Sequence, residues 1–202
     1  MAKILGVYTV EVSAPYRPTV TSEVVVMENL HYGRRMSRVY DLKGSVRSRY
    51  ADPDAEGAVL QDENLLELMF TTPFCLSEAS KLRLAWSIYN DVRFLSSQLV
   101  LDYSLLVAVD KERGELVVGI IDYLTSWSNT KRAEFELKRT GLLGQRGKLP
   151  TIVPPNDYAD RFRDALWHYF VLIPDKFTKL YMTKVTKNHQ IAYLLDVNED
   201  ML

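Results

Sequence analysis

The sequence predicts an α+β fold, and three observations lead to that prediction. Short runs rich in β-branched residues come in pairs with turn residues between them, which is typical of antiparallel strands. Two longer segments instead repeat apolar residues at helical spacing. The chain has 202 residues, 47% of them hydrophobic and 25% charged, which suits a globular chain of one domain, or two, with a sizeable core.

Four strands are predicted in the first quarter of the chain. Residues 4–12 and 20–27 are rich in β-branched residues, and the proline-containing segment between them indicates a turn. This first pair is expected to form a hairpin. Residues 38–42 and 46–50 are two shorter candidate strands around the turn Lys43-Gly44-Ser45.

A helix and a second hairpin are predicted in the middle of the chain. After a polar loop that contains Pro53 and Gly57, Ser77 is a suitable N-cap for a helix that runs to about Ser97. Strands over 105–109 and 116–121 follow, joined by a charged turn that ends in Gly114. The apolar stripe of the helix consists of Ala85, Ile88, Val92 and Leu95.

The last third of the chain begins with a basic segment. Residues 123–150 carry six cationic and two acidic side chains, a local net charge of +4, and are expected to form a loop. Asn156 is then a suitable cap for a helix with an aromatic stripe that ends near Pro174. Residues 176–202 form a polar tail with one apolar patch at 191–195.

Composition narrows the function classes. The net charge of -1 shows no overall bias toward nucleic acid, so we expect no nucleic-acid partner. A single cysteine, Cys75, suits a reducing compartment and is expected to be a buried apolar residue. No stretch approaches the roughly 20 apolar residues that span a bilayer, which favours a cytosolic protein. The three histidines have no metal-ligand spacing, and His168 is expected to lie in the core.

The second hairpin carries a symmetric pair of acidic residues. Asp102 and Asp122 lie at equal distances from the turn near residue 112, so antiparallel pairing brings both to the open end. Two such carboxylates can bind a divalent cation, or one can hold the metal while the other accepts a proton from an attacking hydroxyl. They can equally be solvated strand ends.

The segment DLKGS at 41–45, followed by Arg47 and Arg49, is a second candidate. Gly44 would let the backbone approach a phosphate closely, while Lys43 and the arginines offer positive charge. An anionic substrate would suit this arrangement. A plain turn with exposed basic residues would explain it as well.

Taken together, the motifs DLKGS, LDYSLL and IID resemble the ordered motif set of the phosphatidylinositol phosphate kinases. The surrounding segments AKILGVY, VVVMENLHYGRRMSRVYDLKGS, ELVVGIIDY and PTIVPPNDYADRFRDAL look most like the phosphatidylinositol 3-phosphate 5-kinase branch. The resemblance covers residues 2–177. It implies a two-lobed kinase-like fold, with ATP and Mg²⁺ as cofactors.

The resemblance also implies roles for residues of the catalytic centre. Asp102 matches the catalytic aspartate that orients the inositol hydroxyl, and Asp122 matches the aspartate that holds Mg²⁺ on the ATP phosphates. Lys43 and Arg49 match the basic pair that receives the existing phosphate of the substrate, and Lys43 is counted with the catalytic residues. The family's hinge, which presents backbone groups to adenine, falls at Met27, Glu28 and Asn29.

The basic segment matches the family's specificity loop. Lys131 and Arg132 fall at its basic pair, where the usual pair is Lys-Lys, and are expected to bind substrate. Each basic residue near an anionic leaflet contributes about 1 kcal/mol, so this loop would dock the enzyme weakly on a phosphoinositide-bearing surface. The implied location is the cytoplasm, peripheral on the cytosolic face of endosomal membranes. The alternative interpretation of this basic segment is a solvated, flexible connection with no binding role.

The resemblance divides the chain into three parts. Residues 1–30 match the last strands of the upper lobe and the hinge, 31–177 match the lower lobe, and 178–202 match nothing. A complete kinase of this family carries a Gly-rich loop, a lysine for the ATP phosphates and a helix with a glutamate before AKILGVY. These are missing here, so we expect the chain alone to have little or no activity.

Three accounts of the incomplete upper lobe remain open. The chain is a fragment of a longer lipid kinase, which its intact motifs favour. Alternatively it is a degenerate, non-catalytic subunit that binds or scaffolds, with the tail as the docking element for a protein partner. In the third account a partner chain supplies the upper lobe.

Overall fold

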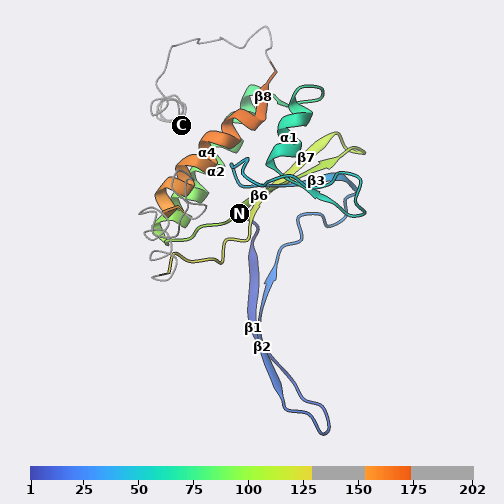
Figure 1. Ribbon diagram of the computed structural model, residues 1–202, viewed down its shortest axis with the longest axis vertical. Coiled ribbons are helices and arrows are strands. Elements are labelled where there is room, and N and C mark those ends of the chain that lie inside the picture. The colour runs from blue at the N-terminus through green and yellow to red at the C-terminus, as the bar shows by residue number, and fades with distance from the viewer. Residues whose placement is uncertain (129–152, 174–202) are drawn as a thin grey trace, which may run out of the picture.

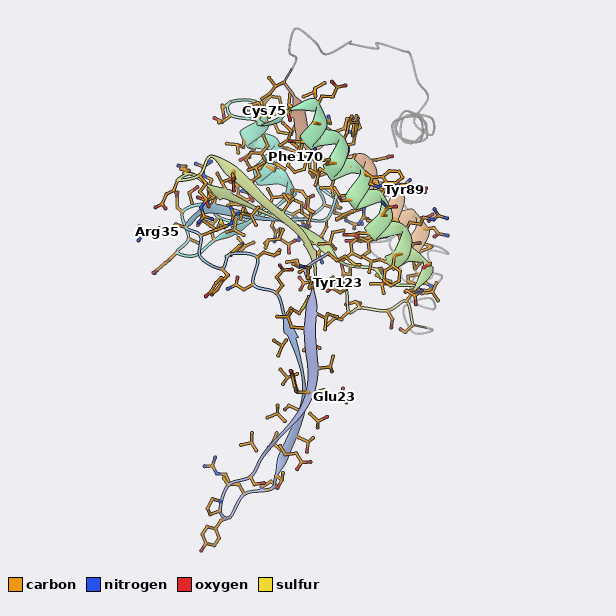
Figure 2. All side chains as sticks on the ribbon, turned by 180° about the vertical axis from the view of Figure 1, so that it is seen from behind. Glu23, Arg35, Cys75, Tyr89, Tyr123 and Phe170 are labelled. Atoms are coloured by element: carbon orange, nitrogen blue, oxygen red, sulfur yellow. The ribbon has the colours of Figure 1, made fainter. Side chains whose placement is uncertain are left out.

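The computed structural model describes residues 1–128 and 153–173 (Figure 1). The first two strands form an antiparallel hairpin, as predicted, in which Val12 pairs with Val20 and Val7 with Val25. This hairpin extends away from the rest of the protein in both views (Figures 1 and 2). The strands are β1 (Ile4–Val12) and β2 (Val20–Met27).

A four-stranded sheet forms the base of the main body. Its order is β4-β3-β6-β7, with β3 parallel to β4 and antiparallel to β6, and with β6 and β7 joined as the predicted second hairpin. The strands are β3 (Met36–Leu42), β4 (Val59–Leu60), β6 (Ser104–Asp110) and β7 (Glu115–Ile121).

The prediction of a strand over 46–50 is wrong. The segment bonds to the start of a short helix instead, because Glu63 N–H donates to the Arg49 carbonyl at 2.9 Å and Ala51 N–H donates to Asn64 Oδ1 at 3.0 Å. Ser48 has a φ of 56°, which is incompatible with an extended strand. That helix, α1 (Asp62–Met69), lies in what the sequence predicted as a loop.

Two longer helices pack side by side in antiparallel directions (Figure 1). In the first, Ser77 is the N-cap and accepts a hydrogen bond from Ser80 N–H at 3.3 Å, as predicted. The second begins with Pro155 at its first turn, so the prediction of Asn156 as its cap was wrong; proline suits that position because its φ is already helical. The helices are α2 (Glu78–Ser97) and α4 (Pro155–Tyr169).

Two short parallel strands complete the described fold. β5 (Phe74–Leu76) pairs with β8 (Phe170–Leu172), so α4 gives way to a strand before the predicted end near Pro174. Cys75 is exposed, contrary to prediction, because Phe74 and Leu76 take the inward positions of a strand in which side chains alternate.

The core lies between the sheet and the helix pair, where the side chains in Figure 2 are most crowded. His168 is not part of it: the residue is exposed on α4, and its Nδ1 lies 2.6 Å from the Asp164 carbonyl. Of the described helices, none is both long and apolar enough to cross a bilayer. The α+β prediction is confirmed. The fully buried large side chains are Tyr40, Leu42, Leu65, Val92, Leu95, Tyr103, Leu105, Val107, Ile120, Phe162 and Phe170.

Candidate functional site

The open end of the β6–β7 hairpin carries Asp102 and Asp122. Ser104 pairs with Ile121 at the last rung of the ladder, so Asp102 comes just before β6 and Asp122 just after β7. Both residues are exposed, and the side chain of Asp102 retains 54% of its accessible surface. Two carboxylates therefore flank one solvent-facing edge of the sheet.

Both aspartates have left-handed backbone conformations. The φ angle is 69° at Asp102 and 59° at Asp122. This region disfavours side chains with a Cβ, although aspartate tolerates it better than most residues. Strained residues of this kind concentrate at functional sites, and here they occur at the two positions that the motifs single out.

Lys43 connects the two motifs. Its ammonium Nζ lies 3.0 Å from Asp102 Oδ1, although the residues are 59 positions apart in the chain. The lysine side chain is 24% exposed, so one side of the ammonium still faces solvent. A cation held between a carboxylate and solvent can bind an anionic group brought to the same edge.

Asp62, which the sequence analysis did not single out, organises the DLKGS turn. Its carboxylate is completely buried and accepts the backbone N–H groups of Lys43, Gly44 and Ser45 at 2.8 to 3.4 Å. Tyr169 donates its hydroxyl to the same carboxylate at 2.9 Å. The acidic first turn of α1 was the available sequence signal, but that helix was predicted as a loop.

Arg49 is held by two carboxylates. Its Nε donates to Asp62 at 2.9 Å and its Nη2 donates to Asp41, and the side chain is only 16% exposed. Burial lowers the pKa of the guanidinium, but the hydrogen bonds to Asp41 and Asp62 outweigh this and leave the pKa above its ordinary value. Arg49 thus neutralises the buried Asp62 and the half-buried Asp41, and so stabilises the turn.

Gly44 makes its close approach to a helix. Its φ is 66°, and a Cβ added there would lie 3.0 Å from the Cα of Phe162 and from the Cβ of Ala165, both on α4. Its N–H already donates to Asp62. The sequence predicted that Gly44 would let the backbone approach a phosphate. In the structure, the close approach that this glycine allows is the packing of the turn against α4.

Buried tyrosines form the floor beneath this turn. Tyr158 donates its hydroxyl to the carbonyl of Tyr103. The two rings pack edge to face, with 4.8 Å between their centroids. Burial raises the pKa of Tyr103, Tyr158 and Tyr169, so all three stay protonated in neutral solution. Tyr158 and Tyr169 donate their hydroxyls, to the Tyr103 carbonyl and to Asp62.

The predicted hinge connects the β1–β2 hairpin to β3. Met27 pairs with Ile4, and Glu28 N–H donates to the Lys3 carbonyl at 2.8 Å. Asn29 Oδ1 then accepts the N–H of His31 at 2.9 Å, which turns the chain toward β3. Figure 2 shows Tyr123, which donates its hydroxyl to the Ala2 carbonyl, where the β1–β2 hairpin joins the body.

The donor set at the open end suits Mg²⁺. This ion is usually bound by one or two carboxylates together with substrate phosphates, so a protein-only cluster is unnecessary. The described residues contain no group of three His, Cys, Asp or Glu side chains placed to hold a metal. Asp122 would be the protein ligand. Lys131 and Arg132 lie outside the described residues.

Comparison with known proteins identifies the family. The sequence profile described as phosphatidylinositol-4-phosphate 5-kinase matches residues 1–116 and 111–169. A protein named 1-phosphatidylinositol 3-phosphate 5-kinase from Mus musculus is 45% identical over 185 residues, which are 89% of this chain and 9% of that protein.

Plant and yeast relatives agree with the mouse protein. Putative 1-phosphatidylinositol-3-phosphate 5-kinase FAB1C of Arabidopsis thaliana is 48% identical over 88% of the chain and 11% of its own length. The 1-phosphatidylinositol 3-phosphate 5-kinase FAB1 of Saccharomyces cerevisiae is 37% identical over 87% of the chain and 8% of its own length. The chain thus spans about a tenth of the length of the curated relatives it matches. The motif resemblance is confirmed: the chain belongs to the phosphatidylinositol-4-phosphate 5-kinase family, and these relatives carry the name of its 3-phosphate 5-kinase branch.

Proposed function

We propose that this chain is the lower part of a lipid kinase catalytic domain. The reaction is transfer of the γ-phosphoryl group of ATP to the 5-hydroxyl of phosphatidylinositol 3-phosphate. The contact between Lys43 and Asp102 carries the proposal, because it joins the two motifs beside Asp122 at a solvent-facing edge. The names of the relatives support the choice of lipid and hydroxyl.

Asp102, Asp122 and Lys43 have separate roles in the proposed reaction. Asp102 orients the attacking hydroxyl and accepts its proton, while the Lys43 ammonium holds that carboxylate in place and contacts the substrate phosphate. Asp122 is the Mg²⁺ ligand. When bound, Mg²⁺ supplies charge neutralisation on the ATP phosphates. Arg49 supports the substrate site through the DLKGS turn.

The kinase-like arrangement of the chain is part of the proposal. Residues 1–30 are the last upper-lobe strands and the hinge, with Met27, Glu28 and Asn29 presenting backbone groups to adenine. Residues 31–177 are the lower lobe. Lys131 and Arg132 bind the lipid headgroup, which places the enzyme on an anionic, phosphoinositide-bearing membrane facing the cytosol, the endosomal membrane first. The tail at 178–202 is available to a protein partner.

Phosphoryl transfer to phosphatidylinositol 3-phosphate in vesicles tests the proposal, with phosphatidylinositol 4-phosphate vesicles alongside. The rate of the chain alone is expected to be low, and Asp102→Asn should lower it by a further factor of about 10² to 10⁴, the range for a positioned general base. Asp54→Asn, on an exposed loop, is the matched control and should not change it. Equal inactivity of the wild type and Asp102→Asn, with both folded, would contradict catalysis by this chain.

Binding of Mg²⁺-ATP separates a kinase from a scaffold. The wild-type chain should bind the nucleotide in a Mg²⁺-dependent way, and Asp122→Asn should abolish that dependence because it removes the proposed ligand. Isothermal titration with and without Mg²⁺ measures both. Absence of nucleotide binding in a folded wild type would favour the degenerate, non-catalytic subunit.

A further inference from the structure

The end of α2 places a leucine where a glycine is usual. Val100 N–H donates to the Leu95 carbonyl at 2.9 Å and Leu99 N–H donates to the Ser96 carbonyl at 3.0 Å, the two hydrogen bonds of a Schellman motif. The residue after the helix cap must be left-handed in this motif and is most often glycine. Here it is Leu99, with a φ of 55°.

Leu99 is also exposed. Its side chain retains 54% of its accessible surface and is not part of the core of the described residues. A leucine in this position therefore combines an unfavourable backbone conformation with an apolar side chain in water. Among the described residues, no packing of the Leu99 side chain in the core compensates for either cost. A side chain that is costly on both counts suggests contact with something outside this chain.

Two further exposed apolar side chains lie on the segments next to Leu99, one at the end of α2 and one after β7. Phe94, in the last turn of α2, is 54% exposed, and Leu124 is 59% exposed. The segment after α2 runs beside the segment after β7 (Figure 1), held by hydrogen bonds from Trp127 N–H to the Leu99 carbonyl and from Leu101 N–H to the Thr125 carbonyl. We call Phe94, Leu99 and Leu124 the apolar lip.

The apolar lip adjoins the candidate catalytic edge. Leu99 precedes Asp102 by three residues, and Leu124 follows Asp122 by two, so the same paired segments carry both the lip and the aspartates. A lipid substrate keeps its acyl chains in the bilayer, and its headgroup must still reach Asp102. The surface next to Asp102 must then face the membrane, and apolar residues there would enter the interface. Arg93, exposed beside Phe94, suits anionic headgroups.

We propose that the apolar lip inserts into the interface of the bilayer that holds the substrate, with Leu99 as its main contact. This inference rests on the proposed lipid kinase function for the choice of occupant. In this proposal, Leu99 occupies a position that favours glycine because the protein uses its side chain to contact the bilayer.

Replacing Leu99 by glycine separates the two roles of the residue. Leu99→Gly relieves the backbone conformation and removes the inserted side chain, so its thermal midpoint should equal or exceed that of the wild type while vesicle binding falls about tenfold. The control is Tyr16→Gly, since Tyr16 is also exposed and has a positive φ, 63°, but lies in the turn of the β1–β2 hairpin. Tyr16→Gly should leave vesicle binding unchanged.

Flotation with vesicles of phosphatidylcholine, phosphatidylserine and phosphatidylinositol 3-phosphate measures the binding of each full chain. Leu99-dependent flotation supports the proposal. Equal flotation of Leu99→Gly and the wild type overturns it, as does failure of the wild type to float, which would leave a protein partner as the occupant of the lip.

A soluble substrate distinguishes failure of the apolar lip from failure of the proposed function. Short-chain phosphatidylinositol 3-phosphate, which needs no membrane, should be phosphorylated equally by the wild type and Leu99→Gly, whereas the vesicle substrate should be phosphorylated more slowly by Leu99→Gly. Equal rates on both substrates would overturn the lip and leave the kinase function standing. Leu99-dependent flotation without transfer to either substrate would support the lip and count against the kinase function.

Discussion

Asp62 neutralises and orders the turn that carries Lys43. A carboxylate in a fully buried position is costly unless hydrogen bonds and a cation compensate for its lost hydration. Here three backbone N–H groups, the Tyr169 hydroxyl and the Arg49 guanidinium do so. The turn has a single conformation because every one of these donors converges on the same side chain.

Asp62→Asn should lower the free energy of unfolding by about 3 to 5 kcal/mol, the range for breaking a buried ion pair, because Arg49 loses one of its two carboxylates. Urea denaturation measures this. Asp54→Asn, an exposed aspartate on the neighbouring loop, should change stability by less than about 0.5 kcal/mol. Equal effects of the two substitutions would show that the buried network does not hold the turn.

Gly44→Ala tests the seating of the same turn on α4. An alanine at φ 66° costs about 1 to 2 kcal/mol through its backbone, and the contact with Phe162 adds about 1 to 3 kcal/mol of overpacking. Gly57→Ala has a similar φ of 68° with open space around it, so it should show the backbone cost alone. Similar losses in the two variants, measured by thermal unfolding, would rule out the contact with α4.

Among the elements, the β1–β2 hairpin differs from every other part of the described fold. Its two strands pair with each other over their whole length and with no other described strand. Apolar side chains on it are largely exposed, as at Val7 with 66% and Val12 with 62%. Figure 2 shows Glu23 midway along this hairpin, with side chains projecting into open space around it. A two-stranded ribbon without a packed face is only marginally stable.

Hydrogen exchange should therefore separate the two hairpins. Amides of β1 and β2 should exchange through local opening, whereas those of β6, in the middle of the sheet with Val107 fully buried, should need global unfolding. Mass spectrometry of peptides from 4–27 and 104–121 compares them directly. Equal protection of both sets would mean that the β1–β2 hairpin is packed in solution.

The whole molecule depends on buried phenols between the sheet and the helix pair. Tyr103 comes just before β6, Tyr158 and Tyr169 lie on α4, and each has 4% or less of its surface exposed. Burial favours the neutral form of each phenol over the phenolate and so raises its pKa. The alkaline limit of the fold follows from these pKa shifts.

Stability should fall above about pH 10. In the unfolded chain the tyrosines ionise near their ordinary pKa of 10, while the folded chain keeps their protons, so the unfolded state binds fewer protons and the free energy of unfolding decreases as pH rises. Each tyrosine contributes a slope of about 1.4 kcal/mol per pH unit above pH 10.

Urea denaturation at pH 9, 10 and 11 measures the slope of this loss. Tyr158→Phe should reduce the slope, because one of the phenols with a raised pKa is gone, although its lost hydrogen bond to the Tyr103 carbonyl lowers stability at every pH. An unchanged slope in Tyr158→Phe would assign the alkaline loss to other groups.

Prediction from sequence succeeded where neighbouring residues decide the outcome. The hairpins at 4–27 and 104–121 and the cap of α2 at Ser77 all involve contacts between residues close in the chain. It failed for the segment 46–50 and for α1, where the hydrogen bonds from Glu63 N–H to the Arg49 carbonyl and from Ala51 N–H to Asn64 Oδ1 span 13 or more residues. No local pattern of apolar residues predicts those contacts.

For the candidate site, the same division holds. The motifs themselves, and the symmetry that brings Asp102 and Asp122 to one end, are properties of the sequence, because antiparallel pairing about a turn fixes register locally. The tertiary structure alone decided that Lys43 meets Asp102 and that Asp62 holds the turn. It also decided that Gly44 packs on α4 and that Leu99 is exposed beside the site. Each of these depends on folding together segments far apart in the chain, where packing and burial, not local propensity, set the free energy.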